Sequence, residues 1–61
     1  MKVKIDYTNW KGERSTREII PIRMFWGENE YHIGFQWLLE AYDVTKDSAR
    51  IFAMKYIHSW E

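Results

Sequence analysis

Gln36–Asp43, with the sequence QWLLEAYD, is the most apolar run in this chain of 61 residues. It combines two aromatic rings, two leucines and an alanine, and it is short for a helix but typical of a strand. The turn-prone residues 45–48 (TKDS) follow directly, and a second apolar segment comes after them. The sequence therefore predicts that this stretch is the central strand, against which the remaining segments pack.

A helix over residues 36–42 is the alternative, because Leu, Glu, Ala and Gln all favour helices. The turn residues on both sides and the β-rich neighbouring segments favour the strand instead.

The segment before the first turn is expected to be a strand with one buried face. Val3, Ile5 and Tyr7 alternate with polar residues, and a period of two is typical of a half-buried strand. We expect this strand to continue to about Trp10. A tight turn at residues 11–13 follows, in which glycine can adopt a positive φ.

The next strand is predicted over residues 14–26, first polar and then apolar. Pro21 lacks an N–H group, so it should lie at a bulge, a bend or an edge, where the sheet curls. Residues 27–30 are expected to form a turn, and residues 31–34 a short strand or a loop.

After the central strand, taken as residues 35–44, the chain is expected to turn at 45–48 and return as a strand over 49–54. Residues 55–60 should form a short strand or a helical turn. This pattern predicts a mainly β fold, a barrel or a sandwich of about five antiparallel strands. The core positions expected from the pattern are Val3, Ile5, Ile20, Leu39, Ala41, Ile51 and Phe52.

Composition limits the function classes. One domain over residues 1–61 is expected, and such a small chain buries only about 60% of the surface that it exposes when unfolded. Four Trp, four Tyr and three Phe exceed what one small core can cover, so we expect a binding surface or a homo-oligomer. The formal net charge of zero argues against a dedicated duplex-DNA binder.

The sequence also predicts several absences. Without cysteine there is no disulfide or thiolate metal site, and we expect neither a metal nor a cofactor. No segment has the signature of a signal peptide or reaches the roughly 20 apolar residues of a membrane span, so a cytoplasmic protein is expected.

The order of the motifs resembles the WYL-domain family, whose name comes from a Trp-Tyr-Leu triplet. The triplet here is Trp37-Leu38-Leu39, and the earlier family features are matched by residues 5–7 (IDY), 11–13 (KGE) and 17–21 (REIIP). The closing strand of the family is matched by residues 50–54 (RIFAM). The resemblance covers almost the whole chain and implies an SH3-like or Sm-like small barrel.

The resemblance also implies a role. WYL domains usually accompany a winged helix-turn-helix in bacterial transcription regulators, where they are thought to sense a ligand, in some cases single-stranded nucleic acid or a nucleotide-like molecule. This chain has no room for a DNA-reading helix, so it looks like a free-standing WYL-like domain of a small bacterial or phage protein. The family commonly has arginines where this chain has Ala53 and Tyr56, whereas Arg50 matches the pattern.

An enzymatic role has little support. His32 and His58 are far apart in sequence, and Ser59 cannot pair with His58 by adjacency, since strand neighbours point to opposite faces. Glu28, Asn29, Glu30 and His32 could in principle bind a cation, but a solvated acidic turn is the favoured interpretation.

The arginines are more informative. Arg14, Arg17 and Arg23 lie on one predicted strand and Arg50 on another, and the planar guanidinium suits phosphate. Three aromatic residues are candidate stacking platforms, and small β-barrels bind nucleotides or single strands with this combination. These platforms are Trp10, Trp37 and Tyr56. The structural alternative is that the tryptophans are core and that the arginines pair across strands with Glu13, Glu18 and Glu40.

Two hypotheses follow. The first is a non-enzymatic module that binds a nucleotide-like or short single-stranded nucleic-acid ligand through Arg17 and Arg50, with Trp37 or Tyr56 stacking on a base. It would act as a regulator or a sequestering protein. The second is a protein-interaction or assembly module, a homo-oligomer or a modulator of a partner protein, for example a phage accessory or counter-defence protein.

Overall fold

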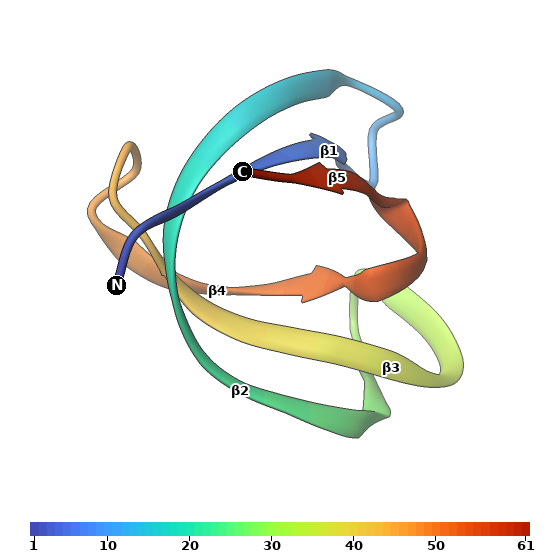
Figure 1. The fold of residues 1–61 in the computed structure, drawn as a ribbon. Helices are drawn as coiled ribbons and strands as arrows, with labels where there is room; N and C mark the ends of the chain where they lie inside the picture. Colours follow the sequence, from blue (N-terminus) through green and yellow to red (C-terminus); the bar gives the residue numbers. More distant parts are fainter.

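The structure is a computed structural model that describes residues 1–61 except for the side chain of His32. The chain forms five strands and one 3₁₀ turn, and Figure 1 shows how the labelled strands follow one another in space. In order they are β1 (Val3–Thr8), β2 (Arg14–Asn29), β3 (His32–Asp43), β4 (Ser48–Ala53), the 3₁₀ helix η1 (Met54–Tyr56) and β5 (Ile57–Trp60).

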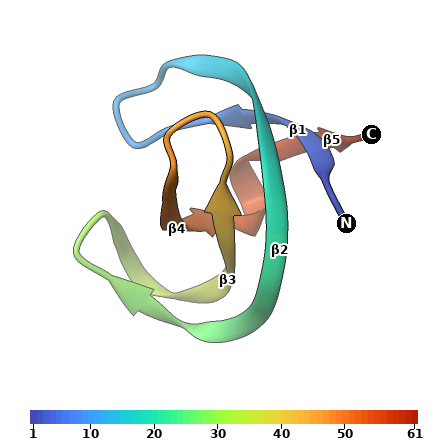
Figure 2. The same ribbon diagram turned by 90° about the vertical axis from the view of Figure 1, so that its left-hand side faces the viewer.

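The strands form one antiparallel sheet in the order β4-β3-β2-β1-β5. Figures 1 and 2 show that this sheet curls on itself, with β2 sweeping around one side. In the described backbone no ladder joins the two edge strands, and η1 connects them instead. The prediction of a mainly β fold with about five antiparallel strands and a turn near the C-terminus is confirmed, and the barrel is open along one seam.

The central segment is a strand of 12 residues, so the helical alternative for residues 36–42 is wrong. The predicted turn at 27–30 is also misplaced, because β2 continues through Gly27 to Asn29 and pairs with β3 up to His32. Gly27 serves packing here: a Cβ at this position would lie 3.2 Å from the ring of Phe25. The bend expected near Pro21 is present as a shift of register between Pro21 and Arg23.

The core lies on the concave face of the sheet. Its largest cluster consists of Ile5, Tyr7, Ile19, Leu39, Ala41 and Phe52. The expected core residues Ile20 and Ile51 are only half-buried, and Val3 packs against the cluster. Val3 is paired with Ile19, and residues directly opposite each other share a face, so Ile19 takes the core position that was assigned to Ile20.

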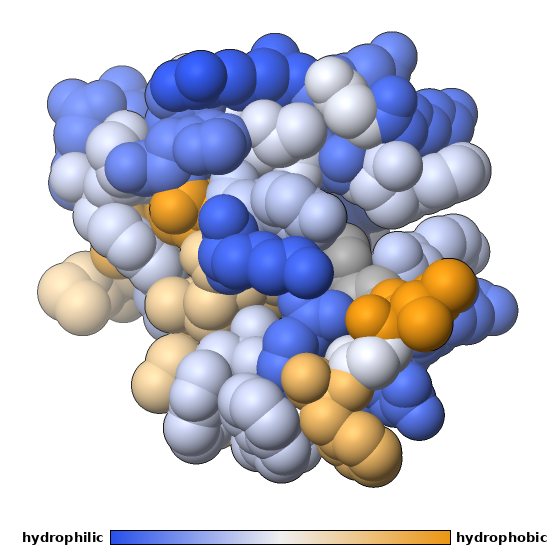
Figure 3. All heavy atoms as spheres, turned by 90° about the vertical axis from the view of Figure 1, so that its right-hand side faces the viewer, coloured by the Kyte–Doolittle hydropathy of each residue, from blue (hydrophilic) through white to orange (hydrophobic). Residues whose placement is uncertain are grey.

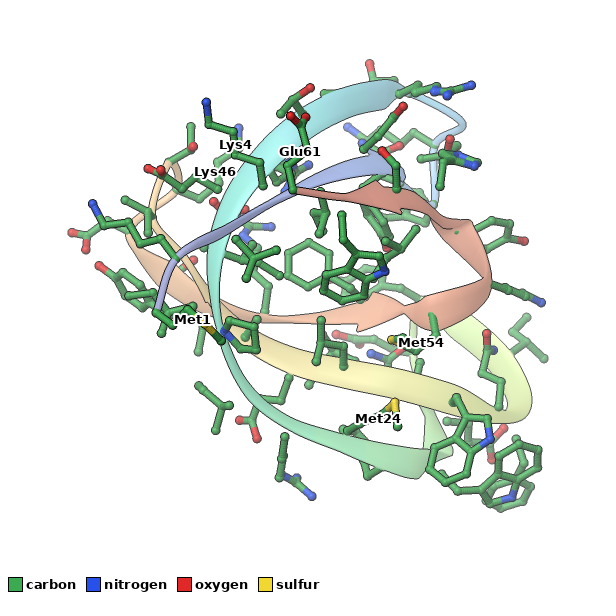
Figure 4. The ribbon with its side chains drawn as sticks, viewed as in Figure 1. Met1, Lys4, Met24, Lys46, Met54 and Glu61 are labelled. Carbon is green, nitrogen blue, oxygen red and sulfur yellow. The ribbon has the colours of Figure 1, made fainter. Side chains whose placement is uncertain are left out.

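The two ends of the chain lie side by side. The amide of Lys4 donates to the carbonyl of Glu61 at 3.0 Å, and the amide of Glu61 donates to the carbonyl of Lys4 at 2.8 Å. Figure 4 shows these two labelled residues next to each other. In the described part of the chain, no helix is long and apolar enough to cross a membrane.

Candidate ligand-binding cavity

The register of the sheet places two arginines on the side of the core. Arg17 of β2 lies opposite Ile5 of β1, and Arg50 of β4 lies opposite Ala41 of β3. Ile5 and Ala41 are both buried in the core, and residues opposite each other in a ladder project from the same face. The core-facing side of the sheet therefore changes from apolar to basic where these arginines stand.

A cavity of about 560 Å³ opens at this place, and both arginines line it. The consecutive residues Ser48–Phe52 also line it, so it runs along the free edge of β4. The wall opposite includes Tyr7 of β1, whose ring meets that of Phe52 edge-to-face at 4.9 Å. The cavity thus lies at the open seam of the barrel.

Arg17 is held by a buried ion pair. Its Nη1 donates to Oδ2 of Asp43 at 2.8 Å, and the two side chains are only 12% and 0% exposed. The other oxygen of Asp43 accepts a hydrogen bond from the amide of Lys46 at 3.2 Å. A buried charge is tolerated only when it is paired, so Asp43 neutralises Arg17 and fixes the guanidinium at the wall of the cavity.

Arg50 differs from Arg17 in having no such partner. It is exposed, and its guanidinium makes no ion pair or hydrogen bond with the described residues. Its five N–H donors are therefore available. Because Asp43 neutralises Arg17, Arg50 is the unpaired cation among the described residues of the lining, and Glu30 carries one opposite charge there.

Two stacked rings stand at the rim. Trp10 follows β1 and Tyr31 lies in the β2–β3 turn, and their ring centroids are 5.6 Å apart at an interplanar angle of 29°. Both rings line the cavity and both are exposed. Figure 2 shows that the two turns project from the same side of the molecule. The amine of Lys11 lies 5.4 Å from the centroid of Trp10, which adds a cation beside this pair.

The other predicted platforms are placed elsewhere. Trp37 lies in the outer part of the β2–β3 hairpin, edge-to-face with Trp26 at 5.6 Å, and does not line the cavity. Tyr56 lines a neighbouring cavity of about 390 Å³, which shares Trp10 and Tyr31 with the first. The structure therefore brings Arg17 and Arg50 together with Trp10, the third candidate platform. Tyr56 lines the neighbouring cavity.

Sequence reasoning missed Tyr31, which belonged to a segment predicted only as a short strand or a loop. No local sequence pattern predicts the role of Tyr31, because its partner Trp10 is 21 positions away and the contact depends on how the two turns meet.

The remaining arginines pair across strands on the outside. Arg23 pairs with Glu40 at 2.7 Å, as the structural alternative proposed, while Arg14 pairs with Asp6 at 2.8 Å rather than with a glutamate. The hydrogen bond from Arg14 lowers the pKa of Asp6. Inside the barrel, burial raises the pKa of the Tyr7 phenol, which keeps this wall of the cavity uncharged.

In the acidic turn that could have held a cation, two side-chain oxygens accept hydrogen bonds from backbone amides instead. Oε2 of Glu28 accepts a hydrogen bond from the amide of Gly34 at 3.1 Å, and Oδ1 of Asn29 accepts one from the amide of Tyr31 at 3.0 Å. The side chain of His32 lies outside the described residues. Among the described side chains, no group of three or more His, Cys, Asp or Glu is arranged to hold a metal ion.

These features define a small, mainly β, partly open barrel with one basic cavity at its seam. The chain belongs to the WYL-domain family, whose model matches residues 1–61. A solved structure that is similar to it is that of proteasome accessory factor B/C (PafBC) of Arthrobacter aurescens, with a TM-score of 0.74 and 23% sequence identity. The match covers 98% of this chain and 9% of that chain, and at this identity it shows a shared fold. No curated protein matches the chain.

Proposed function

We propose that the protein is a non-enzymatic regulatory module that binds a nucleotide-like or short single-stranded nucleic-acid ligand in the cavity along β4. The observation that carries this proposal is the guanidinium of Arg50, which has no partner among the described side chains and lines the same cavity as the stacked Trp10 and Tyr31. A phosphate and a base need these two kinds of group, a guanidinium fork and an aromatic face.

The dimensions and the charge of the cavity favour a small anion. Its volume of about 560 Å³ lies in the range of roughly 300–1,000 Å³ that is usual for small-ligand sites. Since Asp43 neutralises Arg17 and Glu30 carries a negative charge on the lining, the single guanidinium of Arg50 suits one phosphate better than a row of phosphates. Arg17 would offer the hydrogen-bond donors that Asp43 does not occupy, in a fixed orientation.

The two rings at the rim give the base a place to stack. Trp10 and Tyr31 come from different turns, so together they form a platform that either turn alone would not hold in place. Base–aromatic stacking contributes about 1–3 kcal/mol per base and tolerates any base. The site therefore supports a ligand chosen by its phosphate and its ring rather than by its sequence.

The test is a titration of the wild type and of Arg50→Ala with nucleoside monophosphates, cyclic dinucleotides and short single strands. Loss of one charge-assisted contact should weaken binding by about 1.5–3 kcal/mol. Affinity should also fall with rising salt, as it does when phosphates are engaged. The matched control is Arg14→Ala, which removes the same charge from a position that does not line the cavity.

Two results would contradict the proposal. One is a wild type that binds no member of the panel below millimolar concentration. The other is an Arg50→Ala variant that binds as tightly as the wild type, or no more weakly than Arg14→Ala does.

The second candidate function is an assembly module. A group of exposed apolar side chains in the outer part of the β2–β3 hairpin favours it, and this group does not line the cavity. The two functions are compatible because they use different surfaces.

A further inference from the structure

The outer part of the β2–β3 hairpin has no neighbouring strand. β1 pairs with residues 14–19 of β2, and β4 pairs with residues 38–43 of β3. In the described backbone, residues 26–29 and 32–37 therefore pair only with each other, while Met24 and Phe25 pair with Leu39 and Leu38, which β4 flanks. We call residues 24–37 the arm. Its end contacts Trp10 through Tyr31, but a two-stranded hairpin without a flanking strand is at best marginally stable in water.

One face of the arm is apolar and exposed. Leu39 is 5% exposed in the core, and Met24 lies opposite it on the same face. Trp26 and Trp37 are opposite each other one step further out, and Phe35 is two residues beyond Trp37. We call Met24, Trp26, Phe35 and Trp37 the arm face, and each of them is 50% to 67% exposed.

Figure 3 shows pale and orange side chains gathered along the lower part of the molecule, where the hairpin ends. In Figure 4 the labelled Met24 stands on β2, with aromatic side chains beyond it toward the end of the hairpin. Large apolar side chains gathered in this way on a small protein mark an interaction site.

The charges of the arm argue against nucleic acid as the occupant. Residues 24–37 contain no lysine or arginine and two glutamates, so the arm offers no lysine or arginine charge to a row of phosphates. Arg23, directly before the arm, is paired with Glu40 at 2.7 Å. Of the two acids, Glu30 lines the cavity and Glu28 accepts a hydrogen bond from Gly34.

The area of the arm face fits a second copy of this chain. At about 150–250 Å² for a fully exposed large side chain, the four exposed fractions amount to about 450 Å² of apolar surface per copy. Two copies would bury about 900 Å². A standard interface of about 1,600 Å² that is roughly 56–65% non-polar contains about that much apolar area.

We propose that the arm face is the interface of a homodimer, in which a two-fold axis brings the Trp26–Trp37 pair of one copy against that of the other. A two-fold contact uses the same patch on both copies. The formal net charge of the whole chain is zero, and the Arg23–Glu40 pair beside the face is neutral. None of the four side chains of the arm face lines the ligand cavity.

The test is the mass of the full chain in solution, measured by sedimentation at low and at high micromolar concentration. The wild type should approach twice the 7.5 kDa of the single chain as its concentration rises. Trp37→Lys and Phe35→Glu should each stay at the single-chain mass. Trp60→Ser is the matched control, because it removes a comparably exposed indole on β5, outside the arm, and it should dimerise as the wild type does.

Two observations keep the result clear. Far-ultraviolet circular dichroism checks that each variant has the wild-type content of strand. A second readout needs no variant: tryptophan emission of the wild type should shift to longer wavelength on dilution, as rings at the interface become wet. A wild type that keeps the single-chain mass at high micromolar concentration would overturn the proposal. So would a dimer that Trp37→Lys and Phe35→Glu leave intact, or one that Trp60→Ser disrupts equally.

Discussion

The same two strands, β2 and β3, pass through two regions of different character. Where β1 and β4 flank them, the concave face holds the core, and its charged residues are either buried as a pair, as in Arg17–Asp43, or line a cavity, as Arg50 does. In the arm, residues 24–37, the strands have only each other, and the same alternation leaves large apolar side chains in water. The number of neighbouring strands therefore decides whether this alternation buries a face or leaves it exposed.

The largest expected effect comes from breaking the buried charge pair in the flanked region. Asp43→Ala leaves Arg17 without its partner in a site where both side chains are almost fully buried. Removing one member of a buried pair destabilises a protein by about 3–5 kcal/mol. Urea unfolding should show this loss, whereas Asp6→Ala, which breaks the exposed pair with Arg14, should change the free energy of unfolding far less. Equal losses would mean that burial does not distinguish the two pairs.

A comparison along β3 itself should give the next largest effect. Leu39→Ala removes a core side chain and should lower the free energy of unfolding by about 2–5 kcal/mol. Ile33→Ala, at a fully exposed position of the arm, should stay within about 0.5 kcal/mol. Thermal or urea unfolding measures both, and similar losses at the two positions would contradict the division of β3 into core and arm.

Much of this architecture could be predicted from the sequence, because a period of two in Val3, Ile5 and Tyr7 and the apolar run of the central strand are local signals. What could not be predicted depends on register. A slip of one residue exchanges the two faces of a strand, and this is why Ile19 rather than Ile20 lies in the core.

The candidate site was predicted in part for the same reason. Sequence could name Arg17 and Arg50, but the cavity that they share depends on the curl of the whole sheet. It could not separate Trp10 from Trp37, since both stand in aromatic-rich segments and only the meeting of two distant turns places Trp10 on Tyr31. The buried role of Asp43 gave no signal, because its partner Arg17 is 26 positions away.

Two of the exposed tryptophans, Trp10 and Trp37, allow a direct comparison between the cavity and the arm. Trp10→Ala removes a ring from the rim of the cavity and should weaken ligand binding by about 1–3 kcal/mol, the contribution of one base stack. Trp37→Ala removes a ring from the arm face and should leave the affinity unchanged. Fluorescence anisotropy with a short labelled single strand compares them. If Trp37→Ala instead lost more affinity than Trp10→Ala, the result would indicate that the ligand binds at the arm.

The smallest expected effect is a loss of stability at acidic pH. The hydrogen bond from Arg14 lowers the pKa of Asp6 in the folded protein below its value of 3.8 for an unperturbed aspartate. The stabilisation from this pair is therefore fully present above that value and is lost as the pH falls through the lowered pKa. Between pH 6 and pH 3 the wild type should lose slightly more stability than Asp6→Asn, in thermal melts at constant ionic strength. Parallel curves would show that the pair contributes nothing.

The most direct measurement of the central claim is one titration of a short single-stranded oligonucleotide into three proteins: the wild type, Arg50→Ala and Trp37→Lys. The cavity along β4 predicts that Arg50→Ala binds about 10- to 100-fold more weakly than the wild type, as expected for one lost charge-assisted contact. It also predicts that Trp37→Lys binds as the wild type does. The account would be contradicted if Arg50→Ala kept the full affinity, or if Trp37→Lys lost it while keeping its fold.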